Sequence, residues 1–82
     1  MKLYKKNLGQ LCILRWKDAK GQMGTTLQAF VKEGFMVNKT VGWLEYFDKE
    51  KVVLVTERSE QVENVDAVMI PAGWIVGVEW IE

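Results

Sequence analysis

The sequence predicts a mainly β fold, a small five-stranded antiparallel barrel with one short helix after the first strand. Apolar residues recur with a period of two in several short segments, turn-forming residues separate these segments, and no helical pattern late in the chain would link parallel strands. The 82 residues fit a single domain, residues 1–82. A domain of this size buries roughly 60 to 65 per cent of its unfolded surface, so the core must be dense or shared with a second copy.

The first predicted strand covers residues 9–17, where apolar side chains fall on both faces. Such a pattern is typical of a strand in the middle of a sheet. Residues 18–24 contain two glycines and a turn-favouring aspartate, and they predict an exposed loop.

A short helix is expected to begin at Thr25 or Thr26 and to end at Gly34. Thr25 and Gln28 have the spacing of a capping box. The apolar edge of this helix consists of Leu27, Phe30 and Val31. Because so short a helix is unstable alone, we expect this edge to pack onto the sheet and close one end of the core.

The rest of the chain predicts four more strands. The alternating segments are residues 35–47, 52–56, 67–70 and 74–81. The charged residues 48–51 predict a hairpin turn, the polar residues 57–66 predict a mobile connector, and residues 71–73 predict a break before the last strand.

Histidine is absent and Cys12 is the single cysteine, so the sequence offers neither an internal disulfide nor the common zinc and iron ligand sets. We therefore expect no metal or other cofactor and a reducing, cytoplasmic location. No stretch has the apolar length of a signal sequence or a membrane span.

Charge is divided unevenly along the chain. Residues 1–39 hold eight Lys/Arg and two acids, and residues 40–82 hold three and nine, which gives net charges of +6 and −6. If strands from the two halves interleave in the sheet, their charges cancel over the surface. If the charges instead stay on separate faces, the polarised surface would steer an anionic ligand or let two copies associate head to tail. A net charge of zero argues against strong non-specific binding of nucleic acid.

Two segments resemble the signature segments of Sm-like proteins, and this likeness covers about half the chain. They lie at residues 41–55 and 65–78. The resemblance implies the bent five-stranded barrel that Sm-like and SH3-like proteins share, with a 3₁₀ turn before the final strand. Val52 stands where that family carries an Asn for a base, and Pro71-Ala72 replace its Arg/Lys-Gly pair, so its RNA pocket is not carried over.

A second resemblance spans most of the chain. The segments at residues 13–19, 40–44, 52–55 and 70–75 are similar to small uncharacterised proteins of bacteriophages and prophages. This likeness implies an early or accessory phage product that acts in the host cytoplasm. That class is rich in antagonists of host defence and in regulators.

The residues for catalysis are missing. Cys12 lies in mid-strand, Ser59 is the sole serine, and neither has a histidine to activate it. The acids show no spacing that marks an acid–base pair. We therefore expect a protein that is not an enzyme.

The four tryptophans are candidates either for the core or for stacking at a site. Trp80, near the end of an alternating strand, is assigned to the core. The predicted ligand-binding residues are Trp16, Lys17, Lys20, Trp43, Arg58 and Trp74. Aromatic rings among them would stack on a base or sugar, and the cations would meet phosphate.

These observations predict a phage-type binding protein that forms a homo-oligomer and acts by stoichiometric binding. Its ligand is either a host protein, such as a defence protein, or a small anionic, nucleotide-like molecule. The alternatives are a structural or assembly protein of the virion and an Sm-like module for RNA or DNA. Membrane association is not expected, since no basic amphipathic helix is present.

Overall fold

The computed structural model describes residues 2–19, 21 and 23–82. Along the chain its elements are η1 (Lys5–Asn7), β1 (Leu11–Asp18), α1 (Leu27–Lys32), β2 (Met36–Phe47), β3 (Lys51–Arg58), β4 (Val65–Pro71), η2 (Ala72–Trp74) and β5 (Ile75–Trp80), where η denotes a 3₁₀ turn. The prediction of a mainly β chain with five antiparallel strands and one short helix after the first strand is confirmed.

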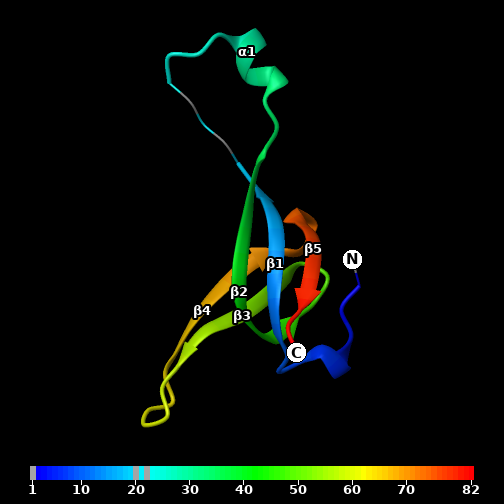
Figure 1. Ribbon diagram of the computed structural model, residues 1–82, viewed down its shortest axis with the longest axis vertical. Coiled ribbons are helices and arrows are strands. Elements are labelled where there is room, and N and C mark those ends of the chain that lie inside the picture. The colour runs from blue at the N-terminus through cyan, green and yellow to red at the C-terminus, as the bar shows by residue number, and fades with distance from the viewer. Residues whose placement is uncertain (1, 20, 22) are drawn as a thin grey trace.

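The strands form one sheet in the order β4-β3-β2-β1-β5 (Figure 1). The last strand pairs with the first, so β1 is a central strand, as its apolar pattern predicted. Within the part of the chain that the structure describes, the sheet is open, with β4 and β5 at its two edges. Closure into a barrel stays a prediction.

The core lies on the inner face of this sheet. Its six fully buried side chains are Cys12, Leu14, Leu44, Val52, Leu54 and Ile70. Half-buried residues surround them, among them Trp16 near one end of β1 and Trp80 at the end of β5. The assignment of Trp80 to the core is therefore confirmed.

The longest strand, β2, joins two ladders. Residues 36–43 pair with β1, and residues 43–47 pair with β3 across a register shift at Glu45. The turn between β2 and β3 is closed by Asp48, whose carboxylate accepts hydrogen bonds from the backbone N–H groups of Glu50 and Lys51 and from the Tyr46 hydroxyl. These donors lower the pKa of Asp48. The charged hairpin turn predicted at residues 48–51 is thus confirmed.

Gly42 allows β2 and β3 to approach each other closely. A Cβ atom at this position would lie 2.7 Å from the carbonyl oxygen of Val55 and 3.1 Å from the Cβ atom of Leu54. Because the nearest atom belongs to the backbone of a paired strand, no side-chain rotation relieves the contact. A glycine here is therefore required by packing.

The described residues between β1 and β2, which are 19, 21 and 23–35 and are called the arm below, project from the sheet with α1 at the tip (Figure 1). The expectation that α1 packs onto the sheet is wrong, because none of its six residues is buried. The helix begins after Thr26, whose hydroxyl accepts a hydrogen bond from the Ala29 N–H, in place of the expected capping box at Thr25. The radius of gyration is 15.6 Å, whereas a compact chain of this length would have about 12 Å.

The segment predicted as a connector, residues 57–66, is strand at its two ends and a loop at residues 59–64. β3 continues to Arg58 and β4 begins at Val65, and these two residues pair with each other. Polar residues occupy both strands because this end of the hairpin extends beyond the core into solvent. Residues 57–66 are called the acidic hairpin below.

Replacing Gly42 with Ala is expected to destabilise the protein by about 1–3 kcal/mol, because the added methyl group forces β3 away from β2. Urea unfolding followed by tryptophan fluorescence measures this change. Gly77→Ala is the matched control, since a Cβ atom on that strand residue meets nothing within 4 Å. Equal stability of the two variants would contradict the close approach of β2 and β3.

Candidate functional site

Two of the predicted tryptophans stack on each other at one end of the core. Trp16 comes from β1 and Trp74 from η2, and their ring centroids lie 6.3 Å apart with an angle of 20° between the planes. The Trp16 indole Nε1 donates a hydrogen bond to the Thr40 hydroxyl over 3.0 Å, and its ring packs against the core. Trp16 therefore supports Trp74, whose side chain is 44% exposed.

A cleft of about 290 Å³ lies beside Trp74, where the arm meets the sheet. It is lined by Lys17, Asp18, Ala19, Phe35, Gly73 and Trp74. Three separate segments build it: the end of β1, the residue before β2, and η2. Because two aromatic rings line one small cleft, a planar ring fits its shape and chemistry.

The two charged residues that line the cleft, Asp18 and Lys17, differ in the contacts that they make. Both carboxylate oxygens of Asp18 are used, one by the Ala19 N–H at 2.8 Å and the other by the Asn38 side-chain amide at 3.2 Å. Lys17 makes no ion pair with any residue that the structure describes. Lys17 is thus the cationic residue of the cleft lining that is left for an anionic ligand.

Trp43 and Arg58, also predicted to bind ligand, lie elsewhere. Gly42 and Leu44 face the core, so Trp43 between them faces the opposite side of the sheet. The Arg58 guanidinium lies 5.6 Å from the centre of the Trp43 ring and donates to the Glu45 carboxylate. This contact joins β2 to β3, and it does not reach the cleft.

The structure therefore brings three of the six predicted residues together: Trp16, Lys17 and Trp74. Lys20 lies outside the described residues. Phe35 was missed because the sequence assigned it to the alternating segment 35–47 as an ordinary strand residue, whereas in the structure β2 begins one residue later, at Met36. Its position directly before β2, opposite the end of β1, is what places it at the cleft.

Few described side chains near the core could act as a nucleophile or bind a metal. The Cys12 thiol is buried near the start of β1, and burial raises its pKa. Among the described residues, no three His, Cys, Asp or Glu side chains gather as a metal site would need. In the same part of the chain, no helix has the length and apolar character that crossing a bilayer requires.

The chain was compared with models of protein families, with curated proteins and with solved structures, and none of them matches it. The likenesses to phage proteins and to Sm-like and SH3-like barrels stay predictions.

The buried thiol gives a direct test of the core. Cys12 is expected to react with Ellman's reagent more than about a hundredfold more slowly in the folded protein than in denaturant, because reaction requires a rare opening of the structure. The absorbance of the released thiolate measures both rates, and Cys12→Ser provides the blank. Similar rates in the two conditions would show that β1 does not bury this side chain.

Proposed function

We propose that this protein is a non-catalytic, phage-type binding protein that acts by stoichiometric capture of a small anionic, nucleotide-like ligand in the cleft beside Trp74. One observation carries the proposal. The exposed Trp74 indole stacks on a second tryptophan and lines one cleft together with Phe35 and with Lys17, a cation that makes no ion pair among the residues that the structure describes.

The chemistry of the cleft fits a ring that carries an anionic group. The base would stack on Trp74 with Phe35 alongside, an interaction worth about 1–3 kcal/mol per base. Lys17 would meet the phosphate. At about 290 Å³ the cleft is at the small end of ligand sites, which favours a compact nucleotide over a polymer.

The architecture is proposed to be an SH3-like or Sm-like barrel. Two features support this proposal: β5 returns to pair with β1, and the 3₁₀ turn η2 precedes the final strand at the position that the resemblance implied. Closing the barrel would require β4 and β5 to approach each other.

Capture of a host protein is the second candidate function. It is favoured by the outer face of the sheet, where Val41, Tyr46 and Met69 are exposed and Trp43 is half-buried. The open edges at β4 and β5 offer backbone groups to an added strand. In this case substitutions on the outer face would abolish binding, and substitutions in the cleft would not.

The test is native mass spectrometry of the protein purified from bacterial cytoplasm, followed by calorimetric titration with mononucleotides and with cyclic mono- and dinucleotides. Trp74→Ala and Lys17→Ala are each expected to weaken binding by about tenfold or more, because each removes one recognised group. Both side chains lie outside the core cluster, so the fold should persist in both variants.

Tyr4→Ala and Lys49→Ala are the matched controls, since they remove an exposed aromatic ring and an exposed ammonium group outside the cleft. They should bind as the unaltered protein does. The proposal is wrong if no nucleotide binds, or if Trp74→Ala and Lys17→Ala bind as tightly as the controls.

A further inference from the structure

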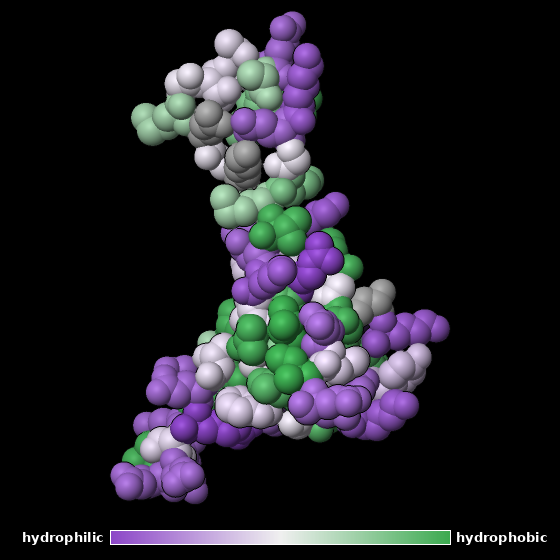
Figure 2. Space-filling model, viewed as in Figure 1, coloured by the Kyte–Doolittle hydropathy of each residue, from purple (hydrophilic) through white to green (hydrophobic). Residues whose placement is uncertain are grey.

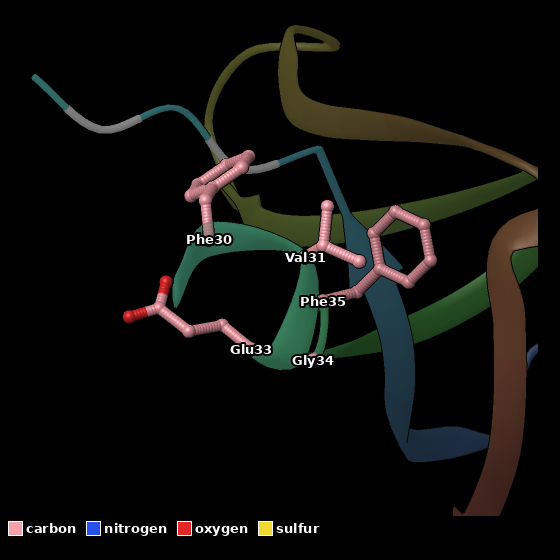
Figure 3. A pocket seen from close by; sticks show the side chains of 5 residues that line it. All are labelled: Phe30, Val31, Glu33, Gly34 and Phe35. Carbon is pink, nitrogen blue, oxygen red and sulfur yellow. The ribbon is translucent and has the colours of Figure 1, made fainter. Parts of the chain in front are cut away.

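The arm exposes apolar side chains that no other described residue covers. Met23 is 96%, Leu27 77% and Val31 71% exposed, and Phe35 at the base of the arm is 67% exposed. Figure 3 shows Phe30, Val31 and Phe35 around a hollow of about 350 Å³ that the arm forms by itself. A contiguous apolar surface of this kind is typical of a binding face.

The helix at the tip of the arm needs a partner. Six residues are too few for a helix to be stable in water, and α1 has no buried residue to hold it. Its side-chain cap is the hydrogen bond from the Ala29 N–H to the Thr26 hydroxyl, and at its other end the Glu33 N–H donates to the Phe30 carbonyl. Contact with another chain would supply the packing that the sheet does not.

The two ends of the molecule carry opposite charge. Around the arm and the strands that lead to it lie Arg15, Lys17, Lys32 and Lys39, with Asp18 and Glu33 as the acids. The acidic hairpin holds Glu57, Glu60, Glu63 and Asp66 with the single cation Arg58. Arg58 is already bound to Glu45, so it does not offset the acids. The uneven charge seen in the sequence therefore forms two separate surface regions.

The acidic hairpin also offers an apolar contact. Val62 and Val65 are about half exposed, and Val62 lines a hollow between the two strands of the hairpin. Figure 2 shows this end as a largely hydrophilic tip with a hydrophobic spot. The acidic hairpin thus matches this end of the molecule in two respects. Its acids are opposite in charge to Arg15, Lys17 and Lys39 on the strands that lead to the arm, and it has an apolar spot of its own.

We infer that the arm of one chain docks on the acidic hairpin of a second copy, in an antiparallel dimer with two-fold symmetry. The arm and the acidic hairpin lie toward opposite ends of the long axis, which extends 50 Å (Figure 1). When two copies lie side by side in opposite directions, each arm meets the other copy's hairpin. Two identical contacts then close the dimer. Two-fold symmetry of this kind is the commonest among oligomers. This assembly is independent of ligand capture in the cleft.

Variants that reverse the charge of the arm or of the acidic hairpin test the proposed contact between them. Lys32→Glu makes the arm more acidic, and the double variant Glu60→Lys, Glu63→Lys makes the hairpin basic. Each variant alone should dimerise about tenfold or more weakly than the unaltered chain, because like charges then face each other. An equimolar mixture of the two should recover a dimer with one chain of each kind, since both of its contacts pair opposite charges.

Sedimentation velocity between about 10 µM and 1 mM measures assembly, and native mass spectrometry identifies the mixed dimer. Lys49→Glu is the control, since Lys49 lies in the β2–β3 turn and should leave dimerisation unchanged. Circular dichroism checks the fold, and all of the exchanged residues are exposed.

Dimerisation of the unaltered chain, its loss in each charge variant and its recovery in the mixture would support the inference. A monomer throughout this range, a series of species larger than a dimer, or charge variants that dimerise normally would overturn it. Binding of the arm to a foreign protein while the chain stays monomeric would overturn it as well.

Discussion

Every other feature of this protein depends on one small apolar core on the inner face of its sheet. Six side chains fill it completely, and all of them come from the four strands β1 to β4. β2 makes this possible because it pairs first with β1 and then with β3, and Gly42 lets β3 come close to it. Few residues are buried in this core, and among the described residues none of the arm belongs to it or packs against it.

The end of the core also shapes the cleft. Trp16 belongs to the core by packing and is fixed by its hydrogen bond to Thr40, so it gives Trp74 a rigid support. Trp74 stacks on this support and stays partly exposed. Phe35 and Lys17 enter the same cleft because the arm leaves and rejoins the sheet there. A site of this kind is built from the end of a strand and two turns, and it needs no catalytic group.

Sequence periodicity predicted the strands well, because alternation reports which side chains face the core. It failed for α1, whose cap and apolar spacing describe the helix itself and contain no information about what the helix packs against. The acidic hairpin was taken for a connector because strands that are solvated on both faces show no alternation. The pairing of Trp16 with Trp74 and the entry of Phe35 into the cleft depend on tertiary register, which a single sequence does not reveal.

Hydrogen exchange followed by mass spectrometry tests most directly the claim that a small core carries an arm without an internal partner. In dilute protein the backbone N–H groups of β1, β2 and β3 should exchange slowly, because their hydrogen bonds break only when the whole core unfolds. The N–H groups of residues 27–32 should exchange at nearly the rate of an unfolded chain. Protection of residues 27–32 equal to that of β1 in the monomer would contradict the account, since α1 would then be held by the chain's own sheet.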